Sequence, residues 1–296
     1  MEVFFSPEYL ACETEFDTTR KADEVAAALH RGSFPGVRLK EPLVATRAEL
    51  LRVHDEDFVD AVLSGEPEGL ASSAGLGWDE GLATSVLAST GGCRDAAIAA
   101  WRDGVAGSLS SGLHHAARAQ GAGYCTFNGI AVAALAFLDQ GAPSVLVLDL
   151  DAHCGGGTAD ILGPDPRVLQ ADVATSSFDR YRPRQGWTLD HVTDAEGYLP
   201  ATARRLDALD PSAIGAVVYN AGMDPHEGCD TGGLDGITDD VLAEREQMVF
   251  AWAATDRLPL AFVLAGGYQG RAMTREHLVR LHLLTVGAAT EAAGTW

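Results

Sequence analysis

Short apolar runs alternate with longer segments of helical periodicity along the 296-residue chain. The run from Ser144 to Asp151 is typical of a strand that is buried on both faces of a sheet. The pattern predicts further strands at 3–5, 168–173, 216–220 and 260–265. It predicts helices at 20–31, 47–63, 82–102, 127–140, 194–209, 239–255 and 274–293. Strands that alternate with helices predict an α/β fold, with a mostly parallel sheet and helices on both faces.

Three of the predicted strands run directly into polar residues that are flanked by glycines. The strand at 144–151 leads into Asp151-Ala-His153-Cys-Gly-Gly-Gly, and the strand at 216–220 leads into Ala-Gly-Met-Asp224. The strand at 260–265 leads into Gly-Gly-Tyr268. Parallel α/β sheets carry their chemistry just beyond the carboxyl ends of their strands. We therefore expect one site that combines these strand ends.

The spacing of acidic and imidazole groups predicts a metal site there. Alternate residues of an extended chain point the same way, so Asp149, Asp151 and His153 would share one face. Neighbouring carboxylates repel unless a cation neutralises them, and zinc binds both Asp oxygen and His nitrogen. Asp224 would supply a third ligand and leave a position for water. The alternatives are a chance acidic loop and, because an Asp before Pro is common in turns, a plain turn at Asp224.

Two further features suggest acid–base and oxyanion chemistry. His114 and His115 precede a glycine-rich turn, and adjacent imidazoles can serve as general base and general acid near pH 7. Tyr268 lies between glycines that allow its phenol to approach a substrate and donate to an oxyanion. Alternatively, the histidines are an ordinary loop pair and the tyrosine is a packed aromatic at a turn.

Composition limits the function classes. Hydrophobic residues make up 47% of the chain, which supports a sizeable core, and no low-complexity linker divides it, so we expect one domain over 1–296. The formal net charge of −21 argues against nucleic-acid binding and would attract a cationic substrate, although acidity can also serve solubility alone. Without a signal-peptide pattern or a membrane-spanning apolar run, we expect a soluble cytoplasmic protein. Five widely spaced cysteines indicate no disulfide framework.

Five motifs in order resemble the histone deacetylase and acetylpolyamine amidohydrolase family over nearly the whole chain. They are Gly112-Leu-His-His-Ala116, Gly123-Tyr-Cys-Thr-Phe-Asn128, Leu148-Asp-Leu-Asp-Ala-His153, Gly222-Met-Asp224 and Ala265-Gly-Gly-Tyr268. The opening, from Phe5-Ser-Pro-Glu-Tyr9 to Thr14-Glu15, and Val53-His54-Asp55 look closer to the acetylpolyamine amidohydrolase branch and to a bacterial member. The resemblance implies an arginase-like fold with an eight-stranded parallel sheet.

The resemblance also implies roles for individual residues. Asp151, His153 and Asp224 match the ligands of one zinc ion per chain. His114 and His115 match the catalytic histidine pair, Asp149 the acid that orients the first histidine, and Tyr268 the tyrosine that polarises the carbonyl. A structural monovalent cation such as K⁺ is implied at Asp149, Asp151, His153, Asp172 and Val173. The substrate tunnel is implied at Tyr124, Gly123 and Gly267.

The chain departs from the family pattern in three places. Gly156 stands where an acid or amide normally supports the second histidine, so His115 is expected to be less basic and less firmly oriented. Ser110-Ser-Gly-Leu113 replaces the usual Arg-Pro-Pro-Gly, which would change the tunnel wall and any product channel. Asp172 carries a charge where a hydroxyl is usual, which would alter the monovalent site.

The function that follows is that of a zinc-dependent amidohydrolase, which removes an acetyl or other acyl group from an amine. Acetyl-lysine peptides, acetylpolyamines and small N-acetyl metabolites are candidate substrates, and the acidic charge favours a small cationic amine. Family likeness also suggests a homodimer. One alternative is a ureohydrolase of the arginase type, whose second metal would need an acid at position 155, where this chain has Gly155. The other is a weakly active module that binds acylated amines.

Overall fold

The computed structural model describes residues 1–13, 17–32, 34–270 and 272–294. Its centre is an eight-stranded sheet with the order β2-β1-β3-β8-β7-β4-β5-β6, in which every strand pair is parallel. The strands are β1 (Glu2–Phe4), β2 (Arg38–Lys40), β3 (Val105–Ser108), β4 (Val145–Asp149), β5 (Val168–Ala174), β6 (Trp187–His191), β7 (Ala216–Asn220) and β8 (Leu260–Val263). The predicted eight-stranded parallel α/β architecture is therefore confirmed.

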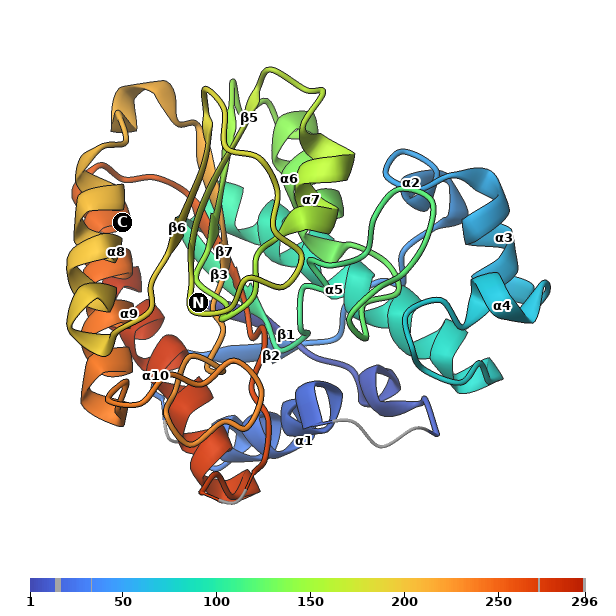
Figure 1. The fold of residues 1–296 in the computed structure, drawn as a ribbon, viewed down its shortest axis with the longest axis horizontal. Coiled ribbons are helices and arrows are strands. Elements are labelled where there is room, and N and C mark those ends of the chain that lie inside the picture. The colour runs from blue at the N-terminus through green and yellow to red at the C-terminus, as the bar shows by residue number, and fades with distance from the viewer. Residues whose placement is uncertain (14–16, 33, 271, 295–296) are drawn as a thin grey trace.

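Helices cover both faces of this sheet (Figure 1). On one face pack α1 (Asp17–His30), α8 (Tyr198–Asp207), α9 (Asp239–Thr255) and α10 (Arg275–Ala293). On the other face pack α5 (Glu80–Asp103), α6 (Gly129–Asp139) and α7 (Gly156–Leu162). The short helices α2 (Arg47–Leu50), α3 (Glu56–Ser64) and α4 (Glu68–Ala71) form a separate lobe beside α5. Three 3₁₀ turns, at Pro7–Leu10, Ala195–Gly197 and Pro211–Ala213, complete the described helices.

Successive side chains of the central strands point to opposite faces of the sheet, and this divides the hydrophobic core into two layers. In β4, Leu146 and Leu148 pack toward α8, α9 and α10, whereas Val145 and Val147 pack toward α5 and α6. All four side chains are fully buried. Burial on both faces explains why β4 reads as a continuous apolar run instead of an alternating one.

The predicted helix at 47–63 is wrong in one respect, because the chain forms two helices there. Thr46 begins α2 with a capping box to Glu49, and α2 ends at Leu50. Asp55 then takes an extended conformation at the start of α3. Between the two helices, His54 turns inward, and its Nδ1 donates to the carbonyl oxygen of Ala117 at 2.9 Å while its Nε2 accepts from the backbone N–H of Asn128 at 3.0 Å. These buried hydrogen bonds outweigh the local helical pattern.

Short elements escaped the sequence pattern. The edge strand β2 has an exposed arginine and an exposed lysine in its three residues, and β3 reads Val-Ala-Gly-Ser, which has little β-propensity. Strand β6 and helix α7 were also not predicted. The three strands depend on pairing with neighbours that are distant in sequence, so local periodicity does not reveal them, and α7 has only seven residues, of which two are glycines.

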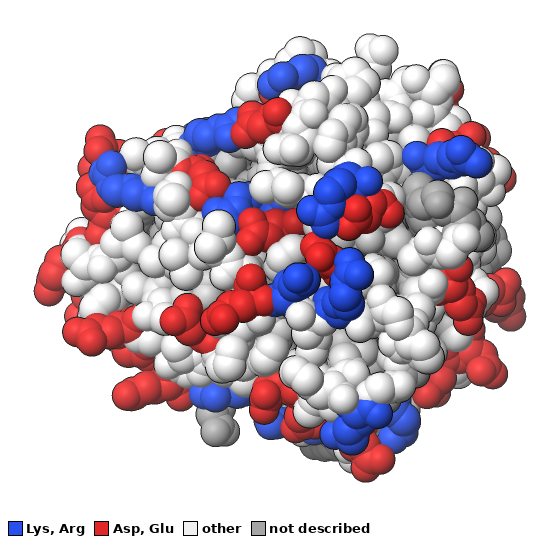
Figure 2. Space-filling model, turned by 180° about the vertical axis from the view of Figure 1, so that it is seen from behind, with Lys and Arg blue, Asp and Glu red and all other residues white. Residues whose placement is uncertain are grey.

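Positive and negative side chains lie close together on one face of the molecule (Figure 2). On the face in Figure 2, Lys and Arg side chains lie among Asp and Glu side chains. Several arginines are paired with acids, such as Arg47 with Asp60 at 2.8 Å and Arg52 with Asp139 at 2.5 Å. Among the described residues, no helix is long and apolar enough to cross a membrane.

Candidate metal centre and active site

The strand order brings the three polar strand ends together. Strands β8, β7 and β4 are neighbours in the sheet, and β3 lies on the other side of β8. The segments that follow these strands carry Tyr268, Asp224, the Asp151–His153 pair and the His114–His115 pair respectively. Residues separated by more than 150 positions therefore meet at one edge of the sheet, as expected for parallel α/β folds.

Asp151, His153 and Asp224 form a compact buried group, with one ligand atom from each residue lying within 4.8 Å of the others. His153 Nδ1 is 3.0 Å from Asp151 Oδ1 and 3.1 Å from Asp224 Oδ2. Burial lowers the pKa of His153, but the two carboxylates outweigh it and raise that pKa to about 11. The carboxylates thus favour positive charge between them, from a proton or from a metal ion.

The residues of this group fit a divalent cation. The buried Oδ2 of Asp224 has only the contact with His153 Nδ1 at 3.1 Å within the described part of the chain, without the geometry of a full hydrogen bond, whereas its Oδ1 accepts from the backbone N–H of Ala152 at 2.9 Å. A Cβ on Gly266 would overlap the Oδ2 atoms of both Asp151 and Asp224, so glycine keeps this space open. Two carboxylate oxygens and one imidazole nitrogen are a donor set that zinc accepts, with room left for water.

The local backbone differs from the extended chain assumed for 149–153. Strand β4 ends at Asp149, and the chain then bends, with the backbone N–H of His153 donating to Asp151 Oδ1 at 2.9 Å. Asp149 Oδ2 lies 2.7 Å from His114 Nδ1, and Asp151 Oδ1 lies 3.6 Å from His114 Nε2, so both carboxylates face the same imidazole. The grouping of Asp151 and His153 depends on this bend and not on strand alternation.

The two histidines have different surroundings. Nδ1 of His114 donates to Asp149 Oδ2 at 2.7 Å, and its ring lies 3.9 Å from the ring of His115. Burial lowers the pKa of His114, but Asp149 and Asp151 outweigh it and raise that pKa to about 10. For His115, burial and the neighbouring His114 lower the pKa. His115 is thus the neutral imidazole of the pair and the better proton acceptor.

The expectation that His115 is loosely oriented is wrong. Its Nδ1 donates to Asp179 Oδ2 at 2.9 Å, so a carboxylate supports the ring although position 156 is glycine. The lowered pKa of His115 was expected, but burial and His114 cause it, not a missing acid. Asp179 was missed because it lies in the connection between β5 and β6, outside the five sequence motifs.

A pocket of about 300 Å³, including its mouth, opens over this group, and its walls include His114, His115, Asp151, Tyr124 and Tyr268. Burial, followed by Asp224 and Asp151, raises the pKa of Tyr268 above its ordinary value, so the phenol stays protonated. Tyr124 and Phe178 are about half exposed. The Phe178 ring meets the His115 ring edge-on at 4.9 Å, and this aromatic was also missed from sequence.

Gly123 and Gly267 play different structural parts. Gly123 has a positive φ of 52°, and a Cβ there would crowd the ring of His115. A Cβ on Gly267 would press against Leu278 and His282, so this residue packs toward α10 behind Tyr268. Both glycines allow close backbone approach near the pocket, and their contact with substrate stays a prediction.

Comparison with known proteins decides the family. A profile of the histone deacetylase domain matches residues 16–199. An uncharacterized protein of Picosynechococcus sp. is 32% identical over 269 residues, which cover 89% of this chain and 88% of that protein. The chain belongs to the histone deacetylase family.

Relatives of this family come from both branches. Histone deacetylase 2 of Arabidopsis thaliana is 32% identical over 248 residues, covering 77% of this chain and 62% of that protein. Acetylpolyamine amidohydrolase 2 of Pseudomonas aeruginosa is 58% identical over only 60 residues, covering 20% of this chain and 17% of that protein. The crystal structure of the HDA15 HD domain has a TM-score of 0.78 at 22% identity, covering 98% of this chain and 88% of that chain, which shows the shared fold.

The assignment to the acetylpolyamine amidohydrolase branch stays a prediction. Two of the residues on which that likeness was based, Thr14 and Glu15, lie outside the described residues.

The residues predicted for the family's monovalent cation lie beside the same site. Asp172 pairs in register with Asp149 and is fully buried. It accepts from the backbone N–H of Gly155 at 2.8 Å, from Gln170 Nε2 at 2.9 Å and from the Tyr181 hydroxyl at 3.0 Å. Burial, followed by Asp149, raises the pKa of Asp172 to about 8. Occupation by K⁺, with Val173 as a further ligand, stays a prediction.

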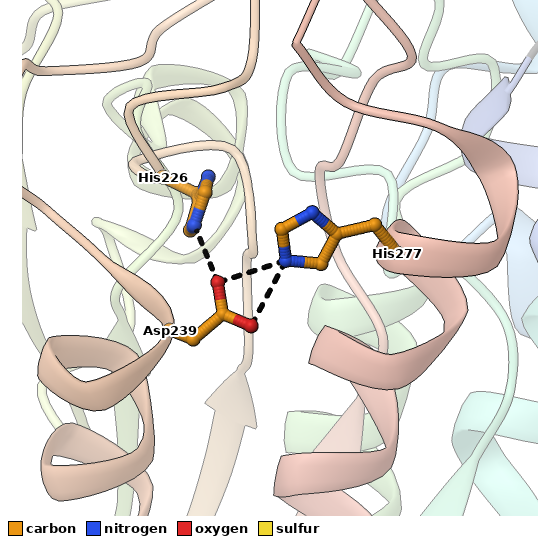
Figure 3. A group of neighbouring side chains, drawn as sticks. All are labelled: His226, Asp239 and His277. Carbon is orange, nitrogen blue, oxygen red and sulfur yellow. Dashed lines mark hydrogen bonds and ion pairs between the residues drawn. The ribbon is translucent and has the colours of Figure 1, made fainter.

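A second group of metal-ligand residue types consists of His226, Asp239 and His277, which come from the segment after β7, from α9 and from α10 (Figure 3). His226 Nε2 is 2.9 Å from Asp239 Oδ1, and His277 Nε2 is 2.8 Å from the same atom. The backbone N–H of Gly228 donates to His226 Nδ1 at 2.9 Å, which places the ring proton on Nε2. That nitrogen therefore donates to Asp239 and has no lone pair for a metal. We interpret this group as a hydrogen-bonded link between α9 and α10.

Proposed function

We propose that this protein is a zinc-dependent amidohydrolase that releases an acyl group from an amine. The observation that carries the proposal is the convergence of the Asp151–His153–Asp224 group with His115 and Tyr268 at one pocket. A metal-ligand group, a neutral base and a protonated phenol are the parts that amide hydrolysis needs. Membership in the histone deacetylase family supports the same chemistry.

The protein side chains would share the reaction as follows. Bound at Asp151, His153 and Asp224, zinc would supply Lewis-acid polarisation and lower the pKa of water. His115 accepts the proton of the attacking water at Nε2, because its Nδ1 already donates to Asp179. Tyr268 donates a hydrogen bond to the oxyanion that develops on the carbonyl oxygen. Return of the proton to the leaving nitrogen breaks the C–N bond and yields a carboxylic acid and an amine, which become a carboxylate and an ammonium ion once the second proton of the water has moved to the amine.

A small cationic acylated amine is the substrate class that we favour. The formal net charge of −21 attracts a cation over long range. The half-exposed rings of Tyr124 and Phe178 offer π faces to which an ammonium group can bind. Acetylpolyamines and acetyl-lysine peptides both carry such a group.

The ureohydrolase alternative conflicts with position 155. A Cβ on Gly155 would lie 2.7 Å from both Asp149 Oδ2 and Gln170 Nε2, so this backbone leaves no room for an additional acidic ligand. The alternative of a binding module is opposed by Tyr268, because binding alone does not require a phenol beside a metal-ligand group.

The test is a panel of acetylpolyamines, acetyl-lysine peptides, longer acyl-lysine peptides and N-acetyl sugars, assayed with the zinc-loaded protein. We expect turnover of at least one cationic substrate, loss of turnover with a chelator, and recovery when zinc is restored. Tight binding without zinc-dependent turnover would instead support the binding module, and urea release from a guanidino substrate would support the ureohydrolase.

A further inference from the structure

Asp179 and Gly156 occupy one space between the β5–β6 connection and the start of α7. Asp179 Oδ2 accepts from His115 Nδ1 at 2.9 Å and from the backbone N–H of Gly157 at 3.0 Å. The Asp179 side chain is 27% exposed, whereas that of His115 is 5% exposed. The carboxylate thus reaches from a partly exposed connection to a buried imidazole.

A side chain at position 156 is incompatible with this arrangement. A Cβ on Gly156 would overlap both the carboxylate and the carbonyl oxygen of Asp179. An acid or amide at 156 and the Asp179 carboxylate in its present place therefore exclude each other. The glycine that looks like a lost support for His115 is what gives Asp179 room.

The connection between β5 and β6 is held next to His115 by its backbone conformation and by a further hydrogen bond. Asp179 has a φ of 57°, in the left-handed region that non-glycine residues seldom adopt and that Asp tolerates better than most. The carbonyl oxygen of Phe178 accepts from the backbone N–H of Cys154 at 3.0 Å, one residue after His153. The backbone conformation and this anchor together aim the carboxylate at His115.

We propose that Asp179 is the positioning residue for His115, and that it takes over the part played in this family by an acid or amide at position 156. By accepting from Nδ1–H it holds the ring in one tautomer, so that Nε2 keeps a lone pair toward the pocket. The catalytic consequence rests on the proposed function, since it requires His115 to act as the base. The tautomer itself does not depend on turnover.

The competing interpretation is that Asp179 only caps α7, through Gly157. We therefore read out the ring directly, by long-range ¹H–¹⁵N spectra of zinc-loaded protein labelled with ¹⁵N-histidine. Asp179→Gly removes the carboxylate and suits the positive φ, so the backbone can keep its course. Asp179→Asn keeps an oxygen that can accept from both His115 Nδ1 and the backbone N–H of Gly157. Arg180→Ala, an exposed neighbour in the same connection, is the matched control.

We expect His115 to be the Nδ1–H tautomer in the wild type, in Asp179→Asn and in Arg180→Ala, and to lose that preference in Asp179→Gly. kcat should fall about 10–100-fold in Asp179→Gly, with KM and zinc content little changed and with substantial recovery in Asp179→Asn. Gly156→Ala should also weaken the tautomer preference, because its methyl group displaces Asp179.

An unchanged His115 tautomer in Asp179→Gly would overturn the proposal, even if kcat fell, since a cap to α7 would then explain the loss. If Asp179→Gly does not fold, Gly156→Ala decides in the same way. A wild type without turnover would remove the proposed function, while the tautomer measurement would still decide the positioning role.

Discussion

His114 Nδ1 lies 2.7 Å from Asp149 Oδ2, and both side chains are buried. Asn220, the last residue of β7, donates from Nδ2 to the other oxygen of Asp149 at 2.8 Å. Asp149 thus accepts hydrogen bonds from two partners, Asn220 at the end of β7 and His114 in the segment after β3, and it favours the protonated form of His114. The histidine pair therefore divides into a charged member next to Asp149 and a neutral member next to Asp179.

Asp149→Asn should lower kcat by at least about 10-fold, because the amide removes the charge that orients and stabilises His114. Zinc content should be unchanged, since the metal group does not include this residue. Steady-state kinetics together with metal analysis would check both points. Asp207→Asn, at the exposed end of α8, is the matched control. Wild-type kcat in Asp149→Asn would contradict the assigned part of His114.

Tyr268→Phe should lower kcat by roughly 100-fold or more, because the phenol donates to charge that appears only in the transition state. KM and zinc content should change little, since the ring is retained. The comparison with Tyr124→Phe, at the half-exposed rim of the pocket, separates an oxyanion donor from a general loss of aromatic hydroxyls. Equal effects of the two substitutions would argue against the role of Tyr268.

Metal analysis of the purified protein should find one zinc ion per chain. Asp224→Ala should lower zinc affinity by orders of magnitude, because it removes one of three protein ligands. Asp239→Ala should leave the zinc content unaltered, because His226 carries its ring proton on Nε2 and so has no lone pair there for a metal ion. Two zinc ions per chain, or zinc lost in Asp239→Ala, would contradict the assignment of zinc to the Asp151–His153–Asp224 group alone.

His54 should make the stability of the fold depend on pH. Burial lowers the pKa of His54 from 6.5 to about 4, and the N–H of Asn128 points at its Nε2, so the folded state favours the neutral ring. The unfolded chain binds the proton more tightly, and stability is therefore lost as pH falls from 6.5 toward 4. A shift of this size corresponds to about 3 kcal/mol.

Urea unfolding at several pH values would measure the slope of the unfolding free energy against pH. His54→Gln, which cannot titrate, should flatten it, whereas His191→Gln, at the exposed end of β6, should not. A wild-type slope in His54→Gln would assign the acid sensitivity to other groups.

The central strands could be predicted from sequence because strands that are buried on both faces have consecutive apolar residues. Strands β4, β7 and β8 are apolar at consecutive positions, and the polar residues that follow them mark where they end. The helix at 47–63 failed because His54 has its partners at Ala117 and Asn128, more than sixty residues away. A local pattern cannot report such long-range hydrogen bonds.

The sequence by itself determined the parallel α/β class, which depends on periodicity, and it indicated the family and the residues Asp151, His153 and Asp224, which stand in motifs at strand ends; the bend after β4 that brings Asp151 and His153 together was seen only in the structure. Only the tertiary structure decided what supports His115. Position 156 looked like a missing acid, yet the folded chain brings Asp179 into that space from a connection without a motif. A hydrogen bond depends on where atoms lie and not on which position in the chain supplies them, so the same support can come from a different loop.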